Sequence, residues 1–451
     1  MEEKILELIE GKNYTRLRSL LAEMNPADIA QIFNDVPKDR LIVVFRILPK
    51  ELSAEVFTYL ESDMQQLVIE AFSDAELREV LDELFLDDTV DIIDEMPASV
   101  AKRIIKQTDS DTRKKINQLL AYPDDSAGSI MTTEYIDLKK DMTVEEAIEK
   151  IRRIGENAAD IYTCYVIDRS RRLYGYVTVK DLLLCGNDSI IGDIMEENVI
   201  YAYTREDKEE VADKFSKYDL TVLPVVDTEN RLVGIVTVDD AIDVIQEEAT
   251  EDIEKMAAIS PSDKSYFKTS VLSMFNARIP WLLLLMLSST FTGAIISSFE
   301  SRLTVFPALI AFIPMLMGTA GNCGSQSSVT VIRSISLGDI EFKDIFRVIW
   351  KEVRVAVICS IALAIVNFAK LWVIDYWLLG TFDSGKQLVE ISVVCITLLF
   401  TVIMAKVIGC IMPMLAKQFG FDPAVMASPF ITTAVDAISL LIYFSIAMIM
   451  L

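Results

Sequence analysis

One acidic residue, Asp436, stands inside the apolar stretch with which the sequence ends. It is the fourteenth of the 29 residues from Pro423 to Leu451, and none of the others carries a charge. A carboxylate at the middle of a membrane costs roughly 3 kcal/mol on insertion scales, so such a residue usually faces a cavity and has a function. Two such carboxylates, one from each of two chains, would repel each other unless a cation lay between them. The position therefore predicts a dication site, with a structural carboxyl (protonated, or bonded to Thr432 or Thr433) and a proton relay as alternatives.

A second apolar run, residues 303–332, turns polar halfway along. Its segment PMLMGTAGNCGSQSSV spans residues 314–329 and contains glycine, asparagine, glutamine and serine. Pro314 removes a helix hydrogen bond, and carbonyl groups freed in a bilayer must be satisfied by protein or by water. The segment predicts a broken or closely packed helix that lines a water-filled path. The alternative is helix packing through small residues in which the side-chain amides bond between helices.

The candidate ligands at both places are oxygen atoms of carboxylate, amide, hydroxyl and backbone groups. Such ligands suit Mg²⁺ or Ca²⁺ better than zinc or copper. The sequence has no histidine, and its six cysteines are scattered without zinc-ligand spacing, which excludes a Cys/His metal site. Ligand chemistry alone leaves Mg²⁺, Ca²⁺ and Mn²⁺ open.

Charge divides the chain near residue 270. Residues 1–270 hold 58 acidic and 32 basic residues, a net charge of −26, whereas residues 271–451 hold 10 and 11. This predicts an acidic soluble region followed by a membrane region. The acidity argues against nucleic acid as a partner and favours cations. No signal peptide, P-loop or nucleophile–base constellation is present in the sequence, so an enzyme is not expected.

Runs with few or no charges predict five membrane helices, at 279–299, 303–332, 353–378, 388–412 and 428–451. The third and fourth each carry one lysine, Lys370 and Lys406, which we expect to snorkel from near a helix end. The loop after the second helix is the most basic one, which places it and the soluble region in the cytoplasm, as for a bacterial inner-membrane protein. Five helices are few for a pore in one chain, so a homodimer is expected.

The soluble region has two predicted parts. Residues 1–128 have helical periodicity, with prolines at 26, 37 and 49 where short helices would start, which suggests stacked helical hairpins. Within 129–250, YVIDRSRRLYGYVTVKD (165–181) matches VVDTENRLVGIVTVDD (225–240) at a shift of 59. This repeat resembles a tandem pair of CBS domains. That resemblance implies a site for an adenosine nucleotide such as ATP, with Thr178, Asp181, Thr237 and Asp240 near the ribose; the alternative is that these residues cap helices.

The acidic segment AIDVIQEEATEDIEKMAAI predicts a connecting helix from residue 241 to about 270. We therefore expect a multidomain chain of three fold types: an all-α superhelical N domain, an α/β CBS pair, and an all-α transmembrane domain of five helices. The predicted boundaries are 1–128 for the N domain, 129–250 for the CBS pair, 251–275 for the connecting (plug) helix and 276–451 for the transmembrane pore domain.

This order of parts resembles the MgtE family of magnesium channels and transporters over essentially the whole chain. The specific motifs are PMLMGTAGNCGSQ (314–326) and DPAVMASPFITTAVD (422–436). The resemblance implies a homodimeric, Mg²⁺-selective pore in the lipid bilayer. By position in these motifs, Asp436 is the pore ligand, Asp422 lies near the cytoplasmic mouth close to the plug helix, and Gly321 and Asn322 lie beside the ion.

The resemblance also implies a cytosolic Mg²⁺ sensor that closes the pore when Mg²⁺ binds between the N domain, the CBS pair and the plug helix. Acidic residues occur in the matching segments: Glu55, Asp87, Asp91, Asp219, Asp240, Asp243, Glu248, Glu251 and Asp252. A net charge of −26 disfavours compaction, and bound dications would relieve the repulsion. For any single residue of this set, an ordinary solvated carboxylate is the alternative.

Two other functions compete with a magnesium channel. One is a proton-coupled divalent-cation carrier with Asp436 as the relay. The other is a membrane-anchored CBS module that senses a nucleotide. The anchored module leaves the polar residues at two membrane positions unexplained.

Overall fold

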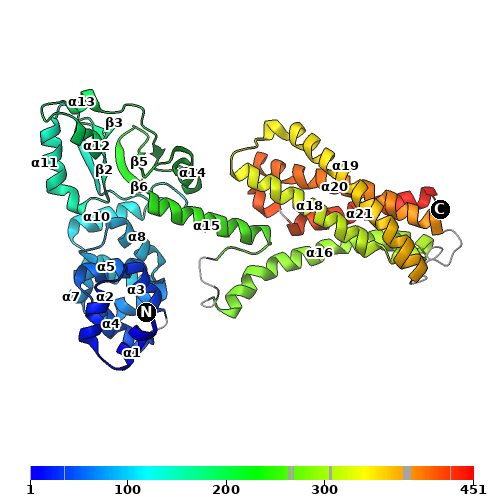
Figure 1. The fold of residues 1–451 in the computed structure, drawn as a ribbon, viewed down its shortest axis with the longest axis horizontal. Coiled ribbons are helices and arrows are strands. Elements are labelled where there is room, and N and C mark those ends of the chain that lie inside the picture. Colours follow the sequence, from blue (N-terminus) through cyan, green and yellow to red (C-terminus); the bar gives the residue numbers. More distant parts are fainter. Residues whose placement is uncertain are drawn as a thin grey trace. The chain divides into compact units, whose positions relative to one another are not determined.

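A computed structural model describes residues 2–34, 36–262, 266, 269–303, 307–378, 387–426 and 428–450. The chain divides into two compact units, residues 1–245 and 246–451 (Figure 1). Each unit is described by itself. Parts of the predicted connecting helix (263–265 and 267–268), of the predicted second span (304–306), of the motif 422–436 (residue 427) and of the predicted last span (residue 451) lie outside the described residues.

In its described residues the first unit begins with ten short helices, which form the predicted all-helical N-terminal part. Pro26 is the first residue of its helix, and Pro37 and Pro49 each stand immediately before one, as predicted from their fixed backbone angle. The helices are α1 (Glu2–Glu10), α2 (Tyr14–Leu21), α3 (Pro26–Phe33), α4 (Lys38–Arg46), α5 (Lys50–Thr58), α6 (Ser62–Ala71), α7 (Asp74–Leu81), α8 (Leu86–Glu95), α9 (Ala98–Gln107) and α10 (Ser110–Leu119).

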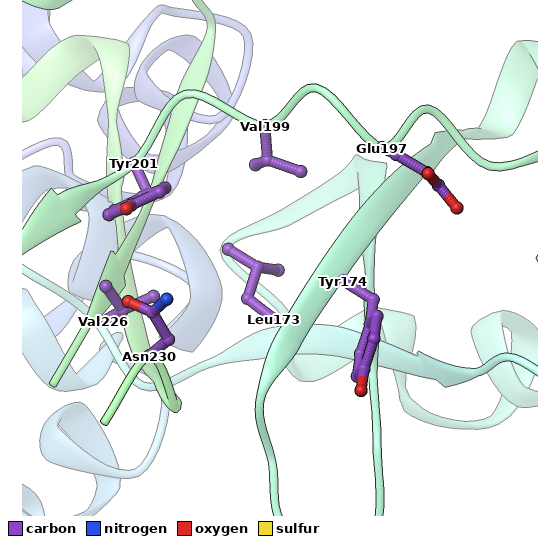
Figure 2. Close-up of a pocket in the computed structure, with 7 residues that line it drawn as sticks. All are labelled: Leu173, Tyr174, Glu197, Val199, Tyr201, Val226 and Asn230. Atoms are coloured by element: carbon purple, nitrogen blue, oxygen red, sulfur yellow. The ribbon is translucent and has the colours of Figure 1, made fainter. Parts of the chain in front are cut away.

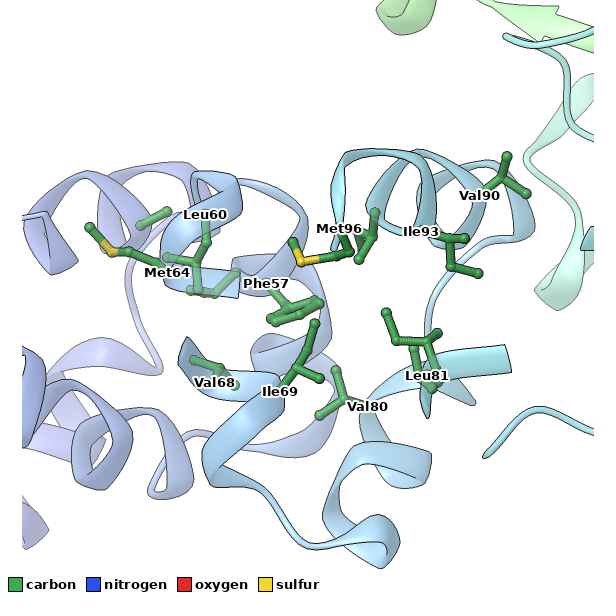
Figure 3. Close-up of a cluster of buried hydrophobic side chains, with 14 of the residues drawn as sticks. Phe57, Leu60, Met64, Val68, Ile69, Val80, Leu81, Val90, Ile93 and Met96 are labelled. Carbon is green, nitrogen blue, oxygen red and sulfur yellow. The ribbon is translucent and has the colours of Figure 1, made fainter. Parts of the chain in front are cut away.

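One apolar core joins these helices. Phe45 packs edge-on against Phe57 at 6.0 Å between ring centroids and against Phe72 at 5.8 Å. Figure 3 shows how the core continues through Ile69 and Val80 toward Ile93 of α8. The core thus holds α8, the helix that carries Asp87, Asp88 and Asp91.

Two three-stranded sheets follow, and they have the same topology. In each, the first pair of strands is parallel and the second antiparallel, with Gly175 opposite Val166 in one and Gly234 opposite Val225 in the other. The strands are β1 (Tyr135–Lys139), β2 (Asp160–Ile167), β3 (Leu173–Thr178), β4 (Ala202–Tyr203), β5 (Val222–Val226) and β6 (Leu232–Thr237), and the helices among them are α11 (Val144–Ile154), η1 (Gly155–Asn157), α12 (Val179–Leu184), α13 (Ile191–Ile194) and α14 (Lys208–Tyr218).

The repeated glycines have the same structural cause in both halves. A Cβ atom on Gly175 would lie 2.6 Å from the carbonyl oxygen of Glu196, and one on Gly234 would lie 2.6 Å from that of Thr132. The two hairpin turns also exchange backbone hydrogen bonds, from Leu173 N to Asn230 O and from Leu232 N to Arg171 O. The sequence repeat is therefore a structural repeat with pseudo-twofold symmetry.

Helix α15 (Val238–Met256) runs from the first unit into the second. The prediction that it continues to about residue 270 is wrong. Ala258 adopts a left-handed conformation (φ 55°), and Ile259 donates its N–H to Glu254 O, which is a pattern that ends helices. Pro261 follows and cannot continue the helix.

The second unit is a bundle of long helices in which α20 packs against α18, α19 and α21. Among the residues that the structure describes, four stretches are long and apolar enough to span a membrane: 271–299, 342–378, 388–418 and 423–450. The helices are α16 (Val271–Leu303), α17 (Pro307–Ile310), α18 (Ile313–Ser336), η2 (Phe342–Asp344), α19 (Ile345–Lys370) with its π-helical continuation η3 (Leu371–Leu378), α20 (Gln387–Gln418), η4 (Pro423–Met426) and α21 (Ser428–Met450).

Helix α18 is the fifth long helix and corresponds to the predicted second span. It has 24 residues, about 36 Å at 1.5 Å per residue, so its length suffices although its glycines and polar residues lower its hydropathy. Within the predicted span 303–332 the helix is interrupted at residues 311–312, between α17 and α18, and it is unbroken from Ile313 onward. Pro314 lies in the first turn, where its missing N–H would have no helical partner anyway, and the helix continues to Ser336.

Candidate functional site

Asp436 lies on α21 and is partly buried. Its Oδ1 atom is shielded from solvent and has no hydrogen-bond partner among the described residues. Thr433 does not supply one, because its hydroxyl donates to the carbonyl oxygen of Pro429 at 3.0 Å. A carboxylate oxygen left without a donor in a membrane bundle is open to a cation.

Helix α18 approaches Asp436 through glycine. A Cβ atom on Gly321 would lie 2.8 Å from Cγ2 of Thr432, which stands one turn before Asp436 on α21. A Cβ atom on Gly324 would likewise lie 3.0 Å from Cγ2 of Ile431 and 3.2 Å from the carbonyl oxygen of Ala405. Helix packing through small residues, the alternative interpretation of this segment, therefore accounts for Gly321 and Gly324.

Gly409 makes the closest helix contact and carries a testable prediction. A Cβ atom on Gly409 would lie 2.2 Å from the carbonyl oxygen of Gly324, so Gly409→Ala must push α18 and α20 apart. We expect a loss of about 1–3 kcal/mol in stability, the usual cost of overpacking. Thermal unfolding in detergent measures this, with Gly293→Ala as the control, since a Cβ on Gly293 meets nothing within 4 Å.

The other face of α18 is polar and exposed in the single chain. Gly318, Asn322 and Gln326 are spaced by four residues and share that face. Exposed amide side chains at membrane depth require water or protein partners. This face, and not a break in the helix, is the part of the predicted segment that is able to line a water-filled path.

Asp422 lies at the turn that leads into η4 and α21. Its Oδ1 accepts the N–H of Ala424 at 2.7 Å, and its Oδ2 pairs with Nζ of Lys255 at 2.7 Å. Lys255 also pairs with Glu251 on its own helix. Burial and then the charge of Asp422 raise the pKa of Asp252. The predicted proximity of Asp422 to the connecting helix is present, and it is mediated by a lysine that sequence reasoning missed.

A second acidic group, which we call the α8–α15 cluster, lies within the first unit and consists of Asp87, Asp88, Asp91, Asp239 and Asp240. Burial, followed by repulsion from Asp240, raises the pKa of Asp91 to about 8. Burial, followed by repulsion from Asp88, raises the pKa of Asp87 to about 7. Burial, followed by repulsion from Asp87, raises the pKa of Asp240 to about 7. The charges of this cluster destabilise one another, so a dication there would be stabilising.

Sequence reasoning singled out Asp87, Asp91 and Asp240 of this cluster but missed Asp88 and Asp239. Burial and then the charges of Asp240 and Asp239 raise the pKa of Asp88 to about 6. The signal was available, because each missed residue directly precedes or follows a predicted one in the sequence. Their carboxylate oxygens are the donors that Mg²⁺ accepts, although within the described ranges no three acidic, cysteine or histidine side chains converge closely enough to hold a metal.

The remaining predicted sensor residues do not join the α8–α15 cluster. Glu55 is exposed on α5, and Asp219 is the left-handed residue (φ 52°) that ends α14. Burial and then Asp239 raise the pKa of Asp243, one turn after Asp239 on α15. Glu248, Glu251 and Asp252 lie farther along α15, in the second unit. The predicted set thus separates into residues of the α8–α15 cluster or next to it, residues farther along α15, and two residues, Glu55 and Asp219, that belong to neither.

The predicted nucleotide residues are engaged in helix caps. Thr178 and Asp181 form a reciprocal capping box at the start of α12, and the Thr237 hydroxyl donates to Asp240 at 2.5 Å. A cavity of about 90 Å³ opens at the opposite ends of these strands, beside Leu173, Val226 and Asn230 (Figure 2). It is far smaller than a typical ligand pocket of about 300–1,000 Å³, so it is not a site for a whole nucleotide.

Two lysines were expected to snorkel. Lys370 is the last residue of α19 and pairs with Asp375 at 2.8 Å. For Lys406 the expectation is wrong, because its side chain is 6% exposed and lies beside Glu352, with 3.9 Å between Nζ and Oε2. An opposite charge on the neighbouring helix makes burial possible where snorkelling would otherwise be required.

Comparisons with known proteins cover every part of the chain. The family model MgtE, described as a divalent cation transporter, matches residues 313–446, and the model of the MgtE intracellular N domain matches residues 24–125. The CBS domain matches twice, at 127–186 and 191–247. The magnesium transporter MgtE of Thermus thermophilus is 36% identical over 459 residues, which cover 100% of this chain and 99% of that protein.

The chain belongs to the MgtE family. The magnesium transporter MgtE of Bacillus subtilis is 34% identical over 98% of this chain and 96% of its own length. The crystal structure of the cytosolic domain of the Mg²⁺ channel MgtE in complex with ATP is 37% identical, with a TM-score of 0.52, and covers 54% of this chain and 100% of that domain. The predicted resemblance and the predicted fold class are confirmed, and the protein is a multi-pass membrane protein of a transporter family.

Proposed function

We propose that this protein transports Mg²⁺ across the membrane through a path lined by Asp436 and the polar face of α18. The observation that supports this most is Oδ1 of Asp436, which is shielded and has no hydrogen-bond partner among the described residues. Gly321 lets α18 pack directly against the turn of α21 that carries this carboxylate. We choose Mg²⁺ as the transported ion because the relatives from Thermus thermophilus and Bacillus subtilis are magnesium transporters.

We also propose that two copies of the chain assemble around this path. Gly318, Asn322 and Gln326 are exposed in the single chain, and a lipid environment does not satisfy amide groups. A second copy would enclose that face and place a second Asp436 near the first. Mg²⁺ with retained water molecules suits two such carboxylates.

Uptake of Mg²⁺ into liposomes that contain the purified protein tests this function. We expect uptake that Ca²⁺ at equal concentration inhibits weakly, and that an imposed pH gradient leaves unchanged. Uptake that follows the pH gradient would instead indicate a proton-coupled carrier. Absence of uptake, with Mg²⁺ kept low on the side of the soluble domains, would contradict the proposal.

Closure by Mg²⁺ on the cytosolic side is the proposed regulation. The α8–α15 cluster holds several mutually repelling carboxyl groups, and Glu251, Asp252 and Asp422 form a second acidic group in the other unit. Dications at these places would favour the compact state by relieving repulsion. We also propose that ATP binds at the CBS pair, because the solved cytosolic domain of the related Mg²⁺ channel MgtE is a complex with ATP. Thr178 and Asp181 are the candidate residues near the ribose.

Lys255 predicts a specific gating phenotype. Although burial opposes it, the bonds to Asp422 and Glu251 raise the pKa of Lys255, so its charge persists and competes with a dication for these carboxylates. Replacing it by Gln should lower the Mg²⁺ concentration that half-closes the pore several-fold. Single-channel or flux measurements against Mg²⁺ test this, and Lys255→Arg should behave as wild type. An unchanged midpoint for Lys255→Gln would count against competition.

A further inference from the structure

Three helices of the membrane bundle share one buried polar group, formed by Ser327, Glu352 and Lys406 from α18, α19 and α20. The Ser327 hydroxyl donates to Oε2 of Glu352 at 2.6 Å, and Nζ of Lys406 donates to Oγ of Ser327 at 3.2 Å. The side chains of Lys406 and Glu352 are 6% and 14% exposed. Neither charge has a role in the ion path described above.

A buried ion pair is an expensive way to hold helices together. Desolvation can exceed the attraction of the two charges, and apolar residues of similar volume often stabilise a protein as well or better. Ionisable groups inside a membrane bundle are a functional hypothesis by default. The value of this group must then lie in the arrangement it imposes.

The contact between α18 and α20 beside Ser327 shows why the rotation of α18 about its own axis needs to be held. Gly324 of α18 and Gly409 of α20 meet backbone to backbone one turn from Ser327. Two glycines bring helices close together, but they have no side chains that interlock and resist rotation. The hydroxyl of Ser327, bonded to a carboxylate on α19 and an ammonium on α20, supplies that resistance.

Rotation of α18 matters because its two faces differ. Ser327 and Gly324 are buried, whereas Asn322 and Gln326 are exposed. Successive helical residues are about 100° apart, so a rotation that released Ser327 would also move Asn322. We propose that Ser327, Glu352 and Lys406 are positioning residues that hold α18 in the rotation that keeps its polar face on the ion path. This inference rests on the proposed transport function.

Ser327→Ala is the discriminating variant, because it detaches α18 from the charge pair and leaves that pair intact. Ser328→Ala is its matched control, since Oγ of Ser328 is buried without a hydrogen-bond partner among the described residues. We expect Ser327→Ala to raise the Mg²⁺ concentration for half-maximal uptake, or to lower the preference for Mg²⁺ over Ca²⁺, by about tenfold. This is the size of effect expected when one hydrogen bond to a charged group is lost. Ser328→Ala should change neither, and Ser327→Thr should restore both.

A second measurement follows α18 without relying on transport. Gly318→Cys, in a chain whose native cysteines are replaced by alanine, places a thiol where nothing lies within 4 Å. Its labelling rate by a water-soluble maleimide should change at least several-fold when Ser327→Ala is added and should not change with Ser328→Ala. Equal labelling and equal Mg²⁺/Ca²⁺ discrimination in the two alanine variants would overturn the positioning role. Labelling that changes in a protein without Mg²⁺ uptake would retain the positioning role and contradict the proposed transport.

Replacing both charges provides an independent variant. Glu352→Met combined with Lys406→Met removes the pair without leaving an unpaired charge, so the bundle should remain folded. We expect it to show the discrimination defect of Ser327→Ala at a melting temperature near that of wild type. If this double variant discriminated between Mg²⁺ and Ca²⁺ as wild type does, the charge pair would have no positioning role and apolar residues would be able to replace it.

Discussion

Replacing Asp436 by Asn should lower Mg²⁺ flux by about 100-fold while the protein still folds. The carboxylate costs roughly 3 kcal/mol at mid-membrane, and the ion must recover at least that much by binding to it. At 1.4 kcal/mol per factor of ten, this is about two orders of magnitude. Asparagine keeps the shape and removes the charge, so liposome uptake of Mg²⁺ measures the charge alone.

Ser445→Ala is the control for this variant on the same helix. Its hydroxyl donates to the carbonyl oxygen of Leu441 one turn earlier on the same helix, so its loss should leave flux unchanged. Size-exclusion profiles and melting temperatures of both variants should match wild type. Flux within a factor of two of wild type for Asp436→Asn would show that the ion does not depend on this carboxylate.

Neutralising the α8–α15 cluster should remove the response of the soluble part to Mg²⁺. In wild type, millimolar Mg²⁺ should slow proteolysis of the N-terminal helices, because a dication offsets the repulsion among Asp87, Asp91 and Asp240. The combined variant with Asn at these three positions should resist the protease equally with and without Mg²⁺. Limited proteolysis of the full-length protein in detergent, with and without a chelator, gives the comparison.

A variant with the same change in net charge separates the cluster from general acidity. Asp39, Asp141 and Asp188 are exposed acids of the same unit, and their replacement by Asn should leave the Mg²⁺ response intact. Loss of the response in that variant would mean that overall charge, and not the α8–α15 cluster, carries it. An intact response in the Asp87/Asp91/Asp240 variant would place the sensor elsewhere.

The same cluster predicts how stability depends on pH. Its folded-state pKa values, about 6 to 8, lie above the ordinary value of 3.8, so the folded state binds more protons than the unfolded state between these limits. Without dications, stability should therefore fall as pH rises from about 5 to 8. Thermal unfolding in chelator should show this fall, and the fall should be smaller in the three-Asn variant, in which Asp88 still has a raised pKa because it is buried.

Local sequence predicted the elements well because local rules govern them. The prolines mark helix starts through their fixed backbone angle, and the repeat at a shift of 59 reappears as two sheets of equal topology. Predictions failed where the outcome depended on the backbone conformation of one residue or on a residue far away in the sequence. The connecting helix stops early because of a left-handed Ala258, and Lys406 is buried because Glu352 lies opposite it on another helix.

The sequence alone was enough to predict the order of parts, the membrane character of the second half and the residue types that are able to hold a hard cation. These follow from composition, periodicity and motifs, which are properties of neighbouring residues. The tertiary structure was needed to show which charged groups lie near one another: Asp91 near Asp240, which repel, and Asp422 with Lys255, which form an ion pair. It also separated the packed glycines of α18 from its exposed polar face. The physical reason is that repulsion, desolvation and close packing depend on distances between residues that are far apart in the chain.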